Sequence, residues 1–166
     1  TATFPAQFML ICSMNPCKCG YFGTNTKECK CTPRQVEQYM AKISGPLLDR
    51  IDIHIDVPAI NFHKLHEKRS EFDSATIRAH VLNARHRQAA RFGASRLVTN
   101  ATMTHRQVEE HCKLDENCTE LLRCAMSEFA LSARAHDKIC KIARTIADLE
   151  ESENIHPEHI AEAISY

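Results

Sequence analysis

The chain has 166 residues, enough for one substantial hydrophobic core or two small ones. Its 21 basic and 21 acidic side chains give a formal net charge of zero, which excludes a globally basic nucleic-acid-binding protein; any such contact would need a local patch. No apolar run approaches the length that crosses a membrane, and since the chain does not begin with Met we expect it to be a fragment or a processed piece.

Residues 1–14 are predicted to form a strand buried on both faces, because residues 8–14 are almost entirely apolar. Asn15 follows directly, and Pro16 ends the regular structure. This places Asn15 at the carboxyl end of a central strand, the edge at which open α/β sheets bind ligands. A neutral amide there could orient a water molecule or a phosphate oxygen.

A long loop over residues 15–32 holds a cluster of cysteines in the pattern C-x-C-x9-C-x-C: Cys17, Cys19, Cys29 and Cys31. Four thiolates fill a tetrahedral zinc shell and leave no open position, so the pattern favours a structural zinc site. The alternative is a metal-free loop whose reduced cysteines only pack together. The odd total of nine cysteines does not resemble a disulfide framework and favours a reducing compartment, so we expect the cytoplasm.

Residues 32–43 are predicted to form a helix, with Thr32 as its cap and Pro33 at its first position. After a Gly-Pro break at 45–46, residues 51–57 alternate strictly between apolar and polar side chains. This alternation predicts a second, half-exposed strand.

Arg50 comes directly before this second strand. It could be a surface arginine paired with Asp49 or Asp52, an interaction of at most about 1 kcal/mol. Alternatively, its planar and permanently charged guanidinium could be presented to the phosphates bound by a neighbouring subunit, where it would stabilise phosphoryl transfer.

From about residue 73 onward the apolar residues recur with a helical period. We therefore place a boundary near residue 70, between the end of an α/β domain at 1–70 and a helical domain at 71–166. Capping residues and prolines predict helices at 74–92, from Thr104 to about Cys112, from Asp115, from Ser132, and from Pro157. On the helix from Asp115 we expect Phe129 to share the core face, and Leu149 belongs to the core stripe of the next helix.

Arg134 lies in the first turn of the helix that Ser132 caps. A cation there opposes the helix dipole by a few tenths of a kcal/mol. Either this small penalty is tolerated, or an anion docks at the helix start on the free N–H groups and the arginine together. The arginines of the helix at 74–92 are interpreted as a solvated face, with nucleic-acid phosphate contacts as the alternative.

The chain contains only four glycines, and none forms a phosphate-binding G-x-x-x-x-G-K-[ST] loop. No strand ends in the paired acids that would hold Mg²⁺. The chain alone is therefore expected not to hydrolyse nucleotide.

Several stretches taken together resemble the C-terminal part of the magnesium-chelatase-like AAA+ proteins of the ComM/YifB type: FPAQFMLICSMNPCKCGY, SGPLLDRIDIHIDVP, NATMTHRQV, LSARAHDKICKIARTIADL and PEHIAEAI. The resemblance implies a mainly α chain with a small α/β part, in which the end of an AAA+ core (two strands and the Cys-rich loop) precedes a helical lid. It also implies that Asn15 is the sensor-1 residue, Arg50 the arginine finger and Arg134 the sensor-2 arginine. The family's nucleotide loop and Mg²⁺-binding strand would lie upstream of Thr1.

The same resemblance implies a role in a hexameric ATP-driven motor that uses ATP and Mg²⁺ in its full-length form. We expect no membrane partner, because the sequence has no apolar run of spanning length. For the ComM type it implies a DNA branch-migration helicase that acts in recombination and natural transformation. Two other classes remain open: a stand-alone zinc-stabilised interaction module, and a motor subunit for chelatase-type insertion of a metal into a tetrapyrrole.

Overall fold

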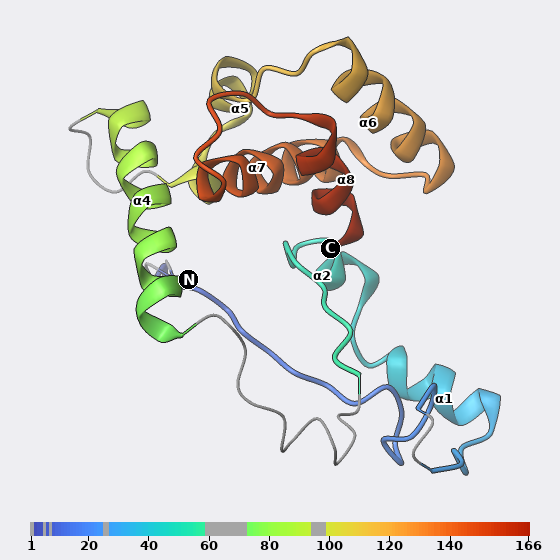
Figure 1. The fold of residues 1–166 in the computed structure, drawn as a ribbon. Coiled ribbons are helices and arrows are strands. Elements are labelled where there is room, and N and C mark those ends of the chain that lie inside the picture. Colours follow the sequence, from blue (N-terminus) through green and yellow to red (C-terminus); the bar gives the residue numbers. More distant parts are fainter. Residues whose placement is uncertain (1, 5, 7, 25–26, 59–72, 94–98) are drawn as a thin grey trace. The chain divides into compact units, whose positions relative to one another are not determined.

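A computed structural model describes residues 2–4, 6, 8–24, 27–58, 73–93 and 99–166 (Figure 1). The chain divides into two compact units. The first comprises Thr1–Arg50 with Asp56–Glu67, and the second comprises Ile51–Ile55 with Lys68–Tyr166.

The structure is mainly α-helical. The first unit contains α1 (Pro33–Met40) and the single-turn α2 (Gly45–Leu48). The described residues of the second unit form a 3-10 turn and five α-helices: α4 (Ser74–Phe92), η1 (Asn100–Thr102), α5 (His105–His111), α6 (Glu116–Glu128), α7 (Ala133–Leu149) and α8 (Pro157–Ser165).

The predicted helix starts are confirmed, because the expected capping residues make the expected hydrogen bonds. Thr32 and Gln35 form a reciprocal capping box at α1, and Thr104 and Gln107 do so at α5. The Asp115 carboxylate accepts the backbone N–H of Cys118 at 2.7 Å at the start of α6. These local interactions satisfy N–H groups that a helix end otherwise leaves without partners.

The prediction of two strands is wrong for the described residues, which contain no β-strand. Residues 8–14 run without a paired neighbour, and their side chains are largely exposed, as at Met9 (83%) and Ile11 (81%). A strand exists only where its N–H and C=O groups pair with an adjacent strand. The apolar pattern is that of a strand buried inside a sheet. The described part of the chain contains no neighbouring strand with which residues 8–14 could pair.

The alternating segment at 51–57 instead makes polar contacts within the second unit. The Lys138 ammonium on α7 donates to the Ile51 carbonyl at 3.0 Å, and the His54 N–H donates to the Tyr166 carbonyl at 2.8 Å. Ile55 and Val57 remain 67% and 84% exposed. This segment is therefore extended chain held at two points, in place of the expected half-buried strand.

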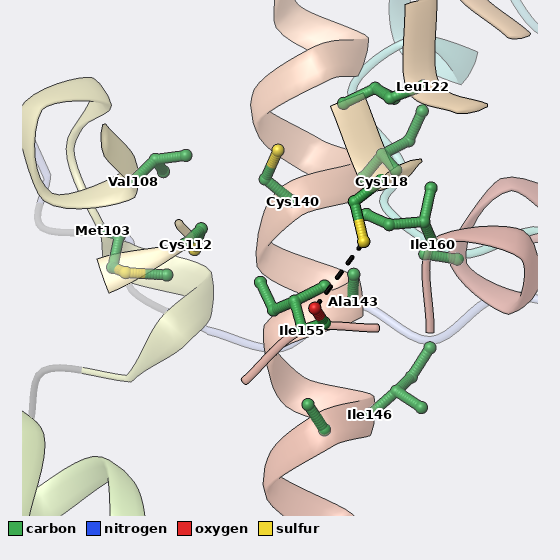
Figure 2. Packing of buried hydrophobic residues seen from close by; sticks show 13 residues of the cluster. Met103, Val108, Cys112, Cys118, Leu122, Cys140, Ala143, Ile146, Ile155 and Ile160 are labelled. Atoms are coloured by element: carbon green, nitrogen blue, oxygen red, sulfur yellow. Dashed lines mark hydrogen bonds between the residues drawn. The ribbon is translucent and has the colours of Figure 1, made fainter. Parts of the chain in front are cut away.

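Helix α7 is the centre of the second unit, since it contacts α4, η1, α5 and α8. It supplies Ile139, Cys140, Ala143 and Ile146 to the hydrophobic core (Figure 2). The small residue Ala143 is fully buried and allows the neighbouring chain to approach closely. Figure 2 also shows the Cys118 thiol of α6 donating to the Ile155 carbonyl, at 3.6 Å.

Two side chains that we expected in this core lie at its edge. Phe129 is the residue that follows α6 and is 59% exposed, and Leu149 is 38% exposed at the end of α7. Both fit the helical period, but the neighbouring elements do not extend far enough to cover the last turn of either helix. The helical period predicts which face of the helix a side chain lies on, but it does not predict whether a neighbouring element covers that position.

Among the described helices, none combines the length and the apolar character that a membrane-spanning segment requires.

Candidate metal centre

The structure brings the four predicted cysteine ligands together. One Sγ atom from each of Cys17, Cys19, Cys29 and Cys31 lies within 4.8 Å of all the others. The shortest separations are 3.3 Å between Cys17 and Cys19, 3.5 Å between Cys19 and Cys29, and 3.8 Å between Cys17 and Cys29. Cys17 is fully buried and the other three are partly buried. We call residues 17–31 the cysteine loop.

Local backbone geometry explains why the two cysteine pairs meet. The Gly20 N–H donates to the Cys17 carbonyl at 3.0 Å, and Gly20 has a φ of +83°, which an L side chain rarely adopts. A second turn follows at once, where the N–H and hydroxyl of Thr24 both donate to the Tyr21 carbonyl. Two consecutive turns send the chain back along itself, and this returns the second cysteine pair to the first.

The sulfur separations fit a tetrahedral zinc shell. Zinc–thiolate bonds of about 2.3 Å in tetrahedral geometry place neighbouring sulfurs about 3.8 Å apart. The shortest observed separations, 3.3 to 3.8 Å, lie at or slightly below that value, so small movements would complete the shell. Four protein ligands leave no position for a substrate, which is typical of a structural site.

The thiols of the cluster have unlike acidities. The backbone N–H of Tyr21 and the Cys17 thiol lower the pKa of Cys19 to about 6. At Cys29 the backbone N–H of Cys31 lowers the pKa, but burial and the neighbouring thiols outweigh it and raise the pKa to about 12. Thiolates packed this closely repel one another, which opposes deprotonation of all four in the absence of a cation. Binding of a divalent cation would remove that repulsion and release the remaining protons.

Asn15 lies two residues before the cysteine loop and is exposed. Its side-chain Cγ would lie 3.9 Å from a Cβ built on Gly20, so the amide sits beside the first turn of the loop. Arg50 follows α2 in the same unit; it is exposed, and its Nη1 donates to the Pro46 carbonyl at 2.5 Å. The guanidinium therefore folds over the short helix that precedes it.

Arg134 is the second residue of α7 and belongs to the second unit. The Ser132 hydroxyl caps this helix by accepting the Ala135 N–H at 3.3 Å, and Arg134 is exposed beside the cap. One turn further along, Asp137 pairs with His105 of α5 at 2.8 Å, and this pairing raises the pKa of His105. The start of α7 thus presents a cation and a histidine that gains positive charge readily.

A buried polar network that was not predicted from the sequence is centred on Asp148, which is 0% exposed at the end of α7. Its carboxylate accepts hydrogen bonds from Arg91 at 2.5 and 2.8 Å and from Asn100 at 2.8 Å. The buried Arg144, one turn earlier, lies 3.1 Å from the same carboxylate and also donates to the carbonyls of Ser152 and Glu153. The network joins α4, η1, α7 and the turn that leads to α8.

Burial alone would raise the pKa of the Asp148 carboxyl. The hydrogen bonds from Arg91 and Asn100 and the charge of Arg144 outweigh burial and hold that pKa below its ordinary value. The spacing of Arg144 and Asp148, four residues apart on one helix, was the available sequence signal. Nothing in the sequence marked Arg91, which we had placed on a solvated face.

Two family models match this chain. The model described as magnesium chelatase, subunit ChlI C-terminal, matches residues 71–166, and the model described as magnesium chelatase, subunit ChlI, matches residues 1–65.

The curated relatives cover nearly the whole chain. Competence protein ComM of Haemophilus influenzae is 36% identical over 165 residues, which is 98% of this chain and 31% of that protein. The YifB proteins of Salmonella typhimurium and Escherichia coli are each 35% identical over 99% of this chain and 31% of their own length. The chain therefore spans about a third of these relatives.

Proposed function

This chain belongs to the magnesium chelatase ChlI family, and from that premise we propose that it is the C-terminal sensor and lid part of an AAA+ ATP-driven motor. The observation that carries the proposal is the pair of family matches, one over residues 1–65 and one over residues 71–166. The proposed domains, an α/β core segment at 1–70 and a helical lid at 71–166, follow this division. No phosphate-binding loop occurs in the sequence, so catalysis requires further parts of a longer protein.

In that motor, three polar side chains would act on the triphosphate. The exposed Asn15 amide would orient the attacking water, and Arg50 would act as the arginine finger on a neighbouring subunit's nucleotide. Arg134 would bind a phosphate at the start of α7, where the free N–H groups of the helix add to its charge. An anion there would also offset the unfavourable position of a cation at a helix N-terminus.

We further propose that the motor is a hexameric DNA branch-migration helicase of the ComM type, active in recombination and natural transformation in the cytoplasm. Its support is the similarity to a competence protein over 98% of this chain. DNA, ATP with Mg²⁺, and further copies of the same protein would be its partners.

The cysteine loop would hold one structural zinc ion through Cys17, Cys19, Cys29 and Cys31. The ion would supply four bonds that fix the two turns of the loop. A short loop with few buried apolar side chains gains much of its stability from such a cross-link.

Two assays of the full-length protein distinguish this function from a chelatase-type motor. We expect ATP- and Mg²⁺-dependent movement of a four-way DNA junction with homologous arms, and no insertion of a metal into a porphyrin. A non-hydrolysable ATP analogue should stop the movement. Absence of ATP hydrolysis by the assembled protein would reject the motor and favour an interaction module, whereas ATP-dependent metal insertion without junction movement would favour the chelatase.

A further inference from the structure

The cysteine loop concentrates positive charge in a chain that has no net charge. It contains Lys18, Lys27 and Lys30 but only one acidic residue, Glu28. All three lysines are exposed, and within the described residues none of them pairs with a carboxylate. A zinc ion bound by four thiolates carries a charge of about −2, which offsets this excess for the loop as a whole, but the sulfurs are at least partly buried. The charge that the loop presents to solvent is therefore mainly that of the three lysine ammonium groups, which are available to bind a polyanion.

The metal ligands themselves determine where two of these lysines point. Each cysteine pair reads Cys-Lys-Cys, with Lys18 between the first two cysteines and Lys30 between the second two. Lys18 lies in the turn that the Gly20 N–H closes on the Cys17 carbonyl, and Lys30 lies in irregular chain; both lysines are exposed, whereas the cysteines beside them are at least partly buried. Because the sulfurs converge within 4.8 Å of one another, both lysines are directed outward from one compact cluster.

The same loop carries an aromatic pair. Phe22 is 52% exposed, although a phenyl ring gains free energy when it is covered. Tyr21 is partly buried, lies 5.5 Å from the Lys27 ammonium, and lines a shallow hollow with Cys19, Lys27, Glu28 and Lys30. Tyr21 and Phe22 follow directly after the turn from Cys17 to Gly20, which attaches both aromatic residues to the metal cluster.

An exposed aromatic ring between lysines matches the chemistry of single-stranded nucleic acid. An unpaired base offers an apolar face for stacking, and the adjacent phosphates bind cations without sequence preference. A duplex hides its bases and could use only the lysines.

We propose that the cysteine loop is a contact site for single-stranded nucleic acid, in which Phe22 stacks on a base and Lys18 and Lys30 bind the flanking phosphates. This inference deepens the proposed function, because it assigns DNA contact to one loop. It does not depend on ATP hydrolysis.

The test measures fluorescence anisotropy of a labelled oligo-dT with the zinc-loaded 166-residue chain. Loss of one stacked base should weaken binding on the order of 10- to 100-fold in Phe22→Ala. The matched control is Phe129→Ala, because Phe129 is similarly exposed (59%) but lies beyond α6 in the other unit. Phe22→Tyr keeps a stacking ring and should retain binding.

The lysines are tested through the salt dependence of binding. For single strands each phosphate contact contributes about 0.7 to the slope of log K against log salt, so Lys18→Gln with Lys30→Gln should reduce the slope by about 1.4. Lys113→Gln changes an exposed lysine of the other unit, two residues after α5, and should leave the slope unchanged.

Equal binding by Phe22→Ala and Phe129→Ala would overturn the proposal, as would equal affinity for single strands and a duplex of the same length. Absence of oligonucleotide binding by a zinc-loaded chain would overturn it as well, and would favour a protein partner for the loop. Zinc content, measured for every variant, excludes loss of the loop's structure as a cause. The binding assay contains no ATP, so a negative result would not bear on the proposed motor, which is tested separately by junction movement. Conversely, a protein that fails to move junctions could still bind single strands at this loop.

Discussion

Arg50 is the residue whose proposed role is most easily separated from structure, because its side chain is exposed and the bond described for it goes to the Pro46 carbonyl of the preceding turn. In the full-length protein, we expect Arg50→Ala to leave nucleotide binding within about twofold and to lower ATP turnover by about 10³-fold or more, as loss of an arginine finger does. Steady-state ATPase assays and nucleotide titration measure the two effects. Arg34→Ala removes an exposed arginine from α1 of the same unit and should change neither. Wild-type turnover by Arg50→Ala would reject the arginine-finger role.

Asp148 differs from Arg50 in that it is buried, and removal of its charge should lower the stability of the folded protein. Asp148→Asn leaves Arg91 and Arg144 without a buried counter-ion, so we expect the free energy of unfolding to fall by about 3–5 kcal/mol at pH 7. Because the folded protein lowers the pKa of Asp148, its stabilisation is present above the ordinary aspartate pKa of about 4 and is lost as the pH falls below it. The difference between Asp148→Asn and wild type should therefore shrink in acid.

Urea unfolding followed by circular dichroism at several pH values measures this difference. Glu110→Ala, at an exposed position of α5, should lie within about 0.5 kcal/mol of wild type. A constant gap between Asp148→Asn and wild type from neutral to acid pH would contradict the ionised state assigned to Asp148.

Among the secondary-structure elements, the helices begin at residues whose side chains cap the free backbone N–H groups. The Asp115 carboxylate accepts the N–H of Cys118 at 2.7 Å, and this bond lowers the pKa of Asp115. We expect Asp115→Ala to cost about 1 kcal/mol of stability through loss of the cap of α6. Glu116→Ala removes a neighbouring acidic side chain without touching the cap, and should cost only a few tenths of a kcal/mol through the helix dipole. Thermal unfolding compares the two, and equal effects would assign the contribution of Asp115 to charge alone.

Local signals explain which parts of the fold the sequence could predict. Caps at Thr32, Thr104 and Asp115 act on N–H groups within one turn, and the helices that they begin were predicted correctly. The short helix α2 was not predicted, because its four residues, which begin with a Gly-Pro pair, are too few to show a helical repeat of apolar side chains. The strand at 51–57 was wrong because a strand depends on a partner that the segment itself does not encode.

The same distinction applies to the site. The convergence of the four cysteines was predictable because metal ligands lie close together in the sequence and cysteine pairs have few other uses in a reducing compartment. The Asp148 network was not predictable, since Arg91 and Asn100 lie 57 and 48 residues away along the chain. The roles of Asn15, Arg50 and Arg134 stay predictions until an assembled complex with nucleotide is tested.

For the whole molecule, the division into two compact units predicts separate responses to metal removal. We expect one zinc per chain, and a strong chelator should increase hydrogen exchange across residues 17–31. The helices of the second unit should keep their exchange protection, since their core lies around α7 and contains no member of the metal cluster. Elemental analysis and hydrogen-exchange mass spectrometry measure both.

A pair of cysteine variants provides the control. Cys29→Ser removes one ligand and should abolish stoichiometric zinc, whereas Cys12→Ser changes an exposed cysteine outside the cluster and should retain it. Undiminished zinc in Cys29→Ser would place the ion elsewhere.

The salt bridge between Arg91 and Asp148 has a mechanical consequence. Helix α7 has 17 residues, so at about 1.5 Å per residue it is a rod about 25 Å long, with Arg134 at one end and Asp148 at the other. Because Asp148 forms an ion pair with Arg91 of α4, the two helices are linked at the end of α7 that is remote from Arg134. If a phosphate that binds at Arg134 tilted α7 by about ten degrees, the far end of α7 would move by about 4 Å, and α4 would move with it. The bridge would then transmit a movement at the start of α7 to α4.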